Sequence, residues 1–401
     1  MNQDQAALIK LLSNRLFGNN HRVLLGDEGW EAVKRESVMQ AVPLLAYEAA
    51  KTQDVDSEVL DGWQKTAMAV LANNVRVDHG HAQLHELMTK AGVPYVILKG
   101  CASAAYYPDP LLRSMGDIDF LVRTEDLGRA GEVLEAHGLR LWDKEHISHI
   151  VYLGNGIPLE MHFSIPGMPD GWAGELIQRH MESVFKDASA QKVGSGQVML
   201  PSDFHHGLII LLHTYHHLTG EGIGLRHLCD WAVFSNSFSD EEFRSMFEKP
   251  LKELGLWRFA QVLTRISINY LGAGEREWAG KPEPVDDQLM EDIVSGGNFG
   301  RKDDNRRVET VLISNRGKHG VGGLSMPRQL VSSMNEIVHT NVPVTRSHPV
   351  LLPVGWLYIV GRTVWRLTTG RRKMVDPLRM MISASKRRDV YSQLHLYESD
   401  R

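Results

Sequence analysis

The chain has 401 residues, 43% of them hydrophobic and 23% charged, and a formal net charge of −5 at pH 7. This composition is ordinary for a globular protein with more than one domain, and the negative charge argues against a protein that coats nucleic acid. The two cysteines, Cys101 and Cys229, can form neither a disulfide framework nor a zinc ribbon, so we expect a reducing, cytoplasmic location.

Residues 1–92 are predicted to form an N-terminal helical region. Apolar residues recur there at helical spacing, and one long helix is expected from about Val55 to Ala91, with Gly92 as its cap. Asn73, Asn74 and Arg76 fall on the polar face of this helix, and we interpret that face as solvated, with a position facing the substrate as the alternative.

Residues 93–165 contain the stretch on which the functional interpretation depends. The apolar run 96–98 predicts a strand that ends at Lys99-Gly100, and a short helix-forming segment and a loop follow it. The next strand is predicted over residues 117–122. Because side chains alternate along a strand, Asp117 and Asp119 point to the same face.

A third acid is supplied by a predicted hairpin. Two apolar runs, 149–153 and 157–163, are joined by Gly154-Asn155-Gly156, and Asn-Gly between such runs is a strong hairpin signal. Glu160 and His162 share a face of the second run. If this strand lies beside the Asp117–Asp119 strand, three carboxylates meet, a set that suits Mg²⁺, with Mn²⁺ as the alternative. Such a site supports two-metal displacement at a phosphate, with backbone N–H groups of the glycine turn facing the triphosphate.

These residues, in this order, resemble a known superfamily. The set Leu98-Lys99-Gly100, Arg113, Asp117-Ile118-Asp119 and Leu159-Glu160-Met161-His162 is similar to the polymerase-β-type nucleotidyltransferases. It is closest to a large bacterial group with the pattern LKG … R.M.DIDLLV … ELH, related to the AbiEii-type nucleotidyltransferase toxins. Where the superfamily usually has Gly-Ser at the turn, this chain has Gly100-Cys101, and Ser103 is the nearest substitute.

The resemblance implies an α+β fold, with a small mixed-sheet nucleotidyltransferase core embedded in a mainly α-helical protein. It implies transfer of an NMP group from an NTP, for which we expect ATP, to the hydroxyl of an unknown acceptor, a small molecule or a sugar, with release of pyrophosphate. The expected catalytic and metal-binding residues are Asp117, Asp119 and Glu160, with Glu160 deprotonating the acceptor. The expected nucleotide-binding residues are Lys99, Gly100, Cys101, Ser103, Arg113, His162, His213, Arg226 and Asp230.

Several alternatives stay open at this point. Lys99 could pair with an aspartate instead of binding phosphate, and Arg113 could form a buried salt bridge with Glu160. The acceptor could be an RNA end, as in the toxins, or the fold could be a catalytically degenerate nucleotide-binding scaffold.

Residues 166–275 are predicted to form a helical domain. His213 and His217 lie one helical turn apart and could chelate a transition metal, but no third ligand is evident from the sequence, so we interpret them as core or substrate-facing residues. Arg226 and Asp230 have the spacing of a helical ion pair, and a place beside the nucleotide is the alternative.

The remaining sequence divides into two segments. Residues 276–330 are rich in glycine and proline and predict a long loop with one short helix, a flexible lid. Residues 331–401 form a helical, basic segment. Its apolar stretch 351–361 is too short and too broken by Pro353 to span a bilayer. The basic run Arg362–Arg388 could bind RNA or an anionic membrane surface, or could be the solvated side of a packed helix.

Overall fold

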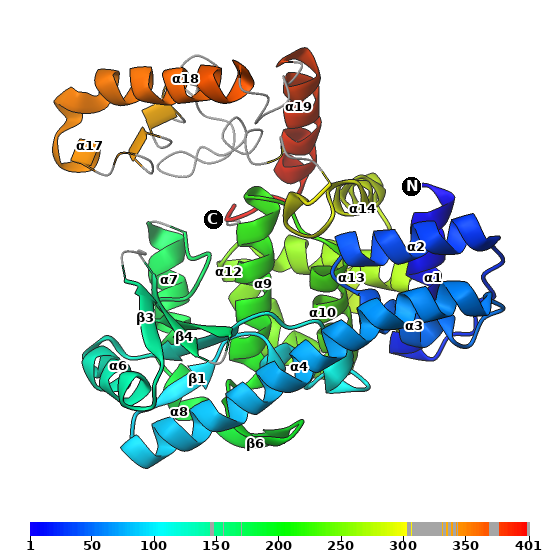
Figure 1. The fold of residues 1–401 in the computed structure, drawn as a ribbon, viewed down its shortest axis with the longest axis horizontal. Helices are drawn as coiled ribbons and strands as arrows, with labels where there is room; N and C mark the ends of the chain where they lie inside the picture. Colours follow the sequence, from blue (N-terminus) through cyan, green and yellow to red (C-terminus); the bar gives the residue numbers. More distant parts are fainter. Residues whose placement is uncertain are drawn as a thin grey trace.

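The computed structural model describes residues 1–144, 148–154, 156–169, 171–302, 344–368 and 377–398, and the single positions 306, 331, 334, 335, 338, 339 and 342. A five-stranded mixed sheet lies at one end of an otherwise mainly helical molecule (Figure 1). This confirms the α+β fold class expected from the sequence.

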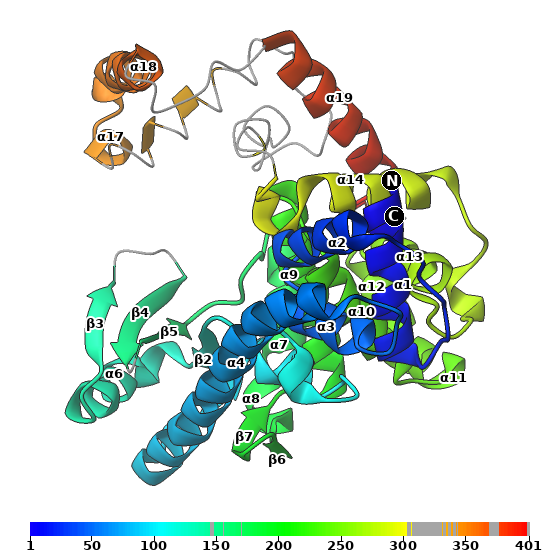
Figure 2. The ribbon, with the colours of Figure 1, turned by 45° about the vertical axis from the view of Figure 1, so that its right-hand side comes forward.

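The N-terminal region contains one helix much longer than the others. As predicted, this helix ends at Gly92, whose φ of 63° is the left-handed conformation that glycine adopts at no steric cost. It reaches from the N-terminal helices to the sheet (Figures 1 and 2). The four helices are α1 (Gln3–Phe17), α2 (Asp27–Met39), α3 (Pro43–Ala50) and α4 (Ser57–Ala91).

The five-stranded sheet has the order β1-β2-β5-β4-β3. β2 and β5 are parallel, and the other neighbours are antiparallel, which includes the predicted β4–β5 hairpin. Ile118 and Phe120 of β2 are fully buried in a core to which α4 and α6 contribute, so the polar side chains of β2 lie on the opposite face of the sheet. The elements are β1 (Tyr95–Ile97), α5 (Cys101–Ala104), β2 (Ile118–Val122), α6 (Leu127–Ala136), β3 (Arg140–Asp143), β4 (His149–Gly154) and β5 (Ile157–His162).

A second, two-stranded sheet lies in the segment predicted to be helical. β6 (Ser189–Val193) and β7 (Gly196–Leu200) form a hairpin that packs on α4. The backbone N–H of Ser195, in its turn, donates to Asp78 Oδ2 of α4 at 2.8 Å. Most of β6 is exposed, and its sequence lacks the alternation of apolar and polar residues that would have predicted a strand.

The helices before and after the sheet share a single hydrophobic core. Leu8 of α1, Trp231 of α10 and Leu263 of α13 are all fully buried in it. The sheet is therefore an insertion between two parts of one helical body. The helices that follow the sheet are α7 (Trp172–Met181), α8 (Val184–Asp187), α9 (Asp203–Thr219), α10 (Leu225–Asn236), α11 (Asp240–Phe243), α12 (Lys249–Glu253) and α13 (Trp257–Leu271).

The predicted lid is in part a core helix. α14 (Pro284–Gly296) buries Leu289 and Ile293 and packs against α13, so residues 284–296 are not a lid. This helix begins with a proline at its first position, and its buried apolar residues recur at helical spacing; both features favour a packed helix over a loop. Most of residues 303–330 lie outside the described residues, and the lid prediction for them is untested.

The C-terminal helices are α17 (Val344–Ser347), α18 (Leu352–Thr368) and α19 (Pro377–Gln393), and α18 lies apart from the helical body (Figures 1 and 2). None of the described helices is long and apolar enough to cross a membrane.

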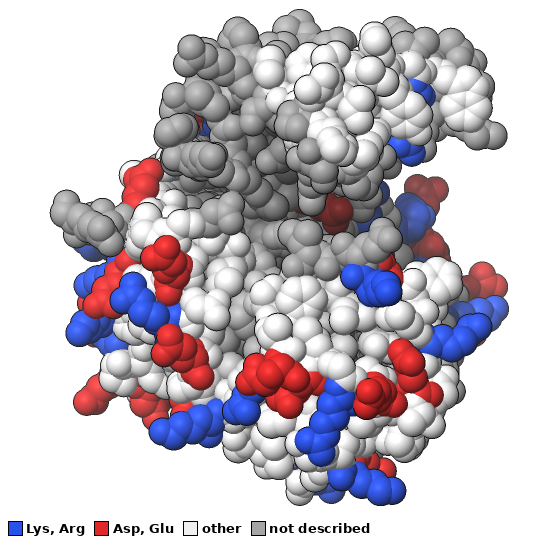
Figure 3. Space-filling model, turned by 90° about the vertical axis from the view of Figure 1, so that its left-hand side faces the viewer, with Lys and Arg blue, Asp and Glu red and all other residues white. Residues whose placement is uncertain are grey.

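The basic run is less exposed than its sequence suggests. Arg387 is buried, and its Nε lies 3.7 Å from Asp292 Oδ1 of α14, so it anchors α19 to the helical body instead of contributing to a basic surface. Arg371, Arg372 and Lys373 lie outside the described residues. On the face shown in Figure 3, basic and acidic side chains are interspersed.

Candidate active site

Three carboxylates converge where β2 and β5 pair. The two strands pair so that Asp119 lies directly opposite Glu160, and Asp117 immediately precedes β2. One oxygen from each of the three side chains lies within 4.8 Å of the others. The structure therefore brings together the three acids that the sequence predicted to meet.

Two basic side chains surround Asp119. Its Oδ1 lies 2.9 Å from Lys99 Nζ and 3.0 Å from His162 Nε2, and His162 Nε2 is also 3.4 Å from Glu160 Oε2. Burial would raise the pKa of Asp119, but the Lys99 ammonium and the His162 imidazole outweigh it and hold this pKa well below its usual range. Lys99 thus pairs with an aspartate, which was one of the two roles left open for it.

The turn that carries Lys99 requires glycine at the next position. Gly100 has φ 62° and ψ −114°, which a side chain would strain, and an added Cβ would lie 3.1 Å from His81 Nε2. His81 is buried in α4, so it has little room to move. The close approach of this turn to α4 places Gly100 and Lys99 beside the acids.

A large cavity opens over these residues. Its volume is about 1850 Å³, and it is lined by residues from the N-terminal helices, the sheet and the helices after it. Ligand pockets usually measure roughly 300–1000 Å³, so this one has room for two substrates. The candidate site residues that line it are Lys99, Gly100, Arg113, Asp117, Asp119, Glu160, His162, His213 and Arg226.

The comparison with known families agrees with this geometry. A family model described as "uncharacterised nucleotidyltransferase" matches residues 26–272, which is more than half of the chain and contains every residue of the site described above. The chain belongs to this family. Among curated proteins, none matches the chain. A nucleotidyltransferase is a transferase that acts on nucleotides, and a closer relation to the AbiEii-type enzymes stays a prediction.

Three of the residues predicted to bind nucleotide do not line the cavity: Cys101, Ser103 and Asp230. Cys101 and Ser103 lie in α5, at 1% and 3% exposure, and Cys101 belongs to the core beneath the sheet. Burial raises the pKa of the Cys101 thiol, so it stays protonated. The Ser103 hydroxyl is buried away from the cavity, so its substitute role stays a prediction that the geometry does not favour, and Gly100 is the residue after Lys99 that lines the cavity.

Arg113 and Asp230, both predicted to bind nucleotide, bind one another. The Nε and Nη2 atoms of Arg113 donate to the two carboxylate oxygens of Asp230 at 2.8 and 2.7 Å, and the Tyr107 hydroxyl donates to Oδ1 at 2.8 Å. Both side chains are less than 10% exposed. Neither the salt bridge to Glu160 nor the i, i+4 pair of Arg226 with Asp230 is formed. Arg113 instead ties the loop before Asp117 to α10.

Arg226 is a half-buried cation that lies beside the acids and forms no ion pair among the described residues. It lies over the ring of Phe299 at 5.4 Å, and its Nη1 makes one long contact of 3.5 Å with the Ser114 carbonyl. Its Nε is buried without a hydrogen-bond partner, and no carboxylate forms an ion pair with it among the described residues. Burial, and then the charge of Arg113, lower the pKa of Arg226. An arginine without a carboxylate partner at a cavity wall is suited to bind phosphate.

Two asparagines of α4 hold the loop that leads to Asp117, a role that was not predicted for them. Asn73 Nδ2 donates to the Met115 carbonyl at 2.7 Å, and Asn74 bonds both the Leu111 carbonyl and the Met115 N–H, at 2.7 and 3.0 Å. The interpretation of this helix face as solvated is wrong for Asn74, which is buried, whereas Asn73 is half-buried and lines the cavity, as in the substrate-facing alternative. Two adjacent asparagines within a helix, where they are poor formers, were the available signal.

Removing the charge of Asp117 should increase the free energy of unfolding of the metal-free protein. The Asp119 charge, and then burial, raise its pKa from 3.8 to about 6, so the folded, metal-free protein binds this proton more tightly than the unfolded chain. Stability therefore falls as pH rises from about 4 through 6. Asp117→Asn should raise the free energy of unfolding at pH 7.5 by about 1–2 kcal/mol and leave it unchanged near pH 4. Urea unfolding in EDTA measures both; a variant less stable than wild type at pH 7.5 contradicts the assignment.

Proposed function

We propose that this nucleotidyltransferase transfers an NMP group from an NTP to an acceptor hydroxyl and releases pyrophosphate, with two Mg²⁺ ions held by Asp117, Asp119 and Glu160. The observation that carries the proposal is the convergence of these three carboxylates in a cavity that also contains the Gly100 turn and Arg226.

The carboxylates fit a divalent cation. They are held so close that the charge of Asp119 raises the pKa of Asp117, and like charges at this distance favour a cation between them. Carboxylate oxygens are the ligands that Mg²⁺ prefers. Mg²⁺, when bound, stabilises the negative charge on the attacking and leaving oxygens.

The chain's own residues supply binding and proton transfer. Arg226 binds the phosphate oxygens through its guanidinium edge, and the backbone of the Gly100 turn approaches the triphosphate without a side chain in the way. Glu160, with 26% of its side chain exposed against 2% for Asp119, is open to an acceptor and takes the hydroxyl proton. The acceptor oxygen then bonds to the α-phosphorus as the bond to the bridging oxygen breaks, and pyrophosphate carries away that electron pair.

Thermal unfolding with each NTP, with and without Mg²⁺, tests this function. We expect one NTP, ATP, to raise the melting temperature only with Mg²⁺. A ligand at a hundred times its dissociation constant stabilises a protein by about 2.7 kcal/mol. The shift should disappear in Asp117→Asn. No shift with any NTP, or a shift of equal size in the variant, argues against the metal-dependent nucleotide site.

We further propose that the acceptor is a small molecule or sugar. On the face shown in Figure 3 basic and acidic side chains are interspersed, and Arg387 of the basic run is buried, which favours such an acceptor over RNA. Activity should therefore change little between 50 and 200 mM salt, whereas an RNA acceptor held by six or more phosphate contacts would lose roughly 1000-fold in affinity. A steep loss with salt, measured on RNA substrates, would restore the RNA-end alternative.

A further inference from the structure

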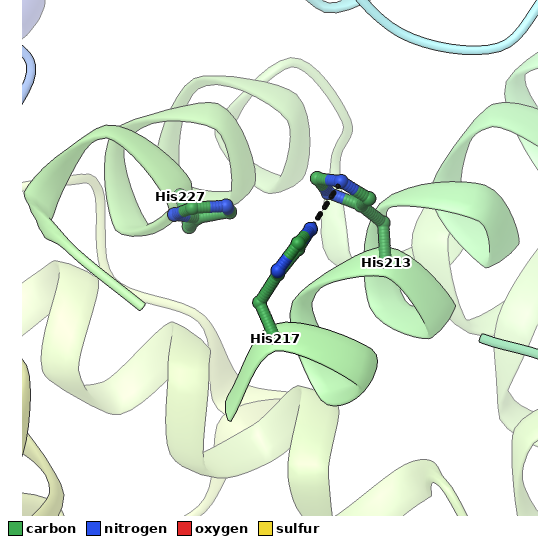
Figure 4. Close-up of side chains that lie close together, drawn as sticks. All are labelled: His213, His217 and His227. Carbon is green, nitrogen blue, oxygen red and sulfur yellow. Dashed lines mark hydrogen bonds between the residues drawn. The ribbon is translucent and has the colours of Figure 1, made fainter. Parts of the chain in front are cut away.

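Three histidines form a cluster beside the acidic site. His213 and His217 lie one turn apart on α9, and His227 lies in the first turn of α10, so that the three rings face a common space (Figure 4). The Nε2 atoms of His213 and His217 are 2.9 Å apart. One ring nitrogen from each of the three lies within 4.8 Å of the others. The third ligand that the sequence did not reveal is thus provided by a different helix.

The environment of the cluster favours neutral imidazole rings. Burial, and then neighbouring positive charges, lower the pKa of all three imidazoles, that of His217 to about 3. All three rings are therefore neutral at pH 7, and neutral imidazole is the form that coordinates a metal ion.

One member of the cluster lacks a partner in the absence of a ligand. His227 is 2% exposed, and its Nε2 has no hydrogen-bond partner among the described residues. Its Nδ1 makes only a long contact, 3.4 Å, with the Gly224 N–H. A buried polar atom without a partner is unfavourable, and such atoms are rare in folded proteins. A metal ion at Nε2 would satisfy this atom; the ring proton would then lie on Nδ1, and the long contact donated by the Gly224 N–H would be lost.

We propose that His213, His217 and His227 bind a single transition-metal ion of the Zn²⁺ class, separate from the Mg²⁺ ions of the acidic site. Imidazole nitrogens favour Zn²⁺ and its neighbours over Mg²⁺. Two nitrogens on a tetrahedral ion, each about 2.0–2.1 Å from it, lie about 3.3 Å apart, close to the separation of His213 and His217. The His227 ring nitrogen lies within 4.8 Å of both.

The fourth coordination position would face the substrates. His213 and His217 line the cavity, and Phe299 covers the cluster on another side, with its ring 4.6 Å from that of His217 and 5.3 Å from that of His227. Lys99 lies between the two sites, 2.9 Å from Asp119 Oδ1 and 3.2 Å from His213 Nε2. Metal binding would replace the contact of Lys99 with His213 and leave its ion pair with Asp119. Three histidines plus one open position is the arrangement of catalytic zinc sites, which take a water or a substrate oxygen.

Titration with Co²⁺ tests the site without nucleotide or activity. Asp117→Asn protein, in which the acidic site lacks a ligand, is freed of metal and titrated with Co²⁺ while the visible absorption of four-coordinate cobalt is recorded. We expect one ion per chain. Replacing His227 by Asn, or separately His217 by Asn, should weaken binding by more than about 100-fold, beyond the range usual for outer-shell changes. His216→Asn, on the same helix but outside the cluster, should bind as tightly as its parent.

The outcomes separate this inference from the proposed function. Absence of a visible band, or a band of equal strength in the His227 and His217 variants, overturns the histidine site. Circular dichroism of each variant establishes whether it is folded. If His227→Asn does not fold, His217→Asn provides the test. A failure of NTP to stabilise the protein would leave the cobalt result unaffected, because the titration requires neither nucleotide nor the acids.

Discussion

Asp119→Asn is expected to abolish nucleotidyl transfer, with a fall in kcat of about 1000-fold or more. Asp119 is the buried carboxylate that contacts both Lys99 and His162 and lies opposite Glu160, so its charge holds the site together. Loss of one group that stabilises charge in the transition state lowers kcat by about 100- to 1000-fold, and we expect loss of a metal ligand to lie at the upper end of this range. The measurement is conversion of α-labelled NTP to NMP and pyrophosphate, with water as the acceptor until the acceptor is known.

The control for this prediction is an acid outside the site. Glu125→Gln changes an exposed acid just after β2 and should retain wild-type activity. If wild type binds NTP but releases no pyrophosphate, and Asp119→Asn alters only binding, the protein is the degenerate scaffold that the sequence analysis left open. A variant at Asp119 with full activity rules out the proposed mechanism.

Asp230→Ala is expected to lower the free energy of unfolding by about 3–5 kcal/mol. The change leaves the Arg113 guanidinium buried without its carboxylate, and breaking a buried ion pair by removing one partner has a cost of this size. Because whole domains are stable by only about 5–15 kcal/mol, the effect is large. Urea unfolding of wild type and variant measures it.

A double variant separates the buried charge from the lost packing. Replacing Asp230 by Leu and Arg113 by Met together removes both charges and should recover much of the stability, since a buried ion pair can often be replaced by apolar side chains. A loss below about 1 kcal/mol in Asp230→Ala would show that Arg113 finds another partner and would return it to the set of candidate phosphate ligands.

The elements that the sequence predicted well are those whose signal is local. The helix of α4 ends at Gly92 because glycine alone adopts the left-handed cap freely, and this is visible in the sequence itself. Asp117 and Asp119 share a face because strand periodicity is two, and the Asn-Gly turn predicts the β4–β5 hairpin in the same way. The acids of the candidate site could therefore be named before the structure was known.

The predictions that failed concern partners far apart in the chain. Arg113 was expected to bind phosphate, but it pairs with Asp230, 117 residues away. Asn73 and Asn74 were interpreted as solvated, but they hold the loop around Met115. A charged or polar side chain has the same local pattern whether it meets a ligand, water or another segment, so its partner cannot be inferred from spacing alone.

The sequence by itself determined the class of the protein, the three acids and the glycine turn, because periodicity and turn chemistry are properties of neighbouring residues. Only the tertiary structure decided that β5 lies beside β2 with Glu160 opposite Asp119, that Arg113 pairs with Asp230, and that His227 completes a histidine cluster. These arrangements depend on how helices and strands pack around a shared core, and packing selects neighbours by shape and burial across the whole chain.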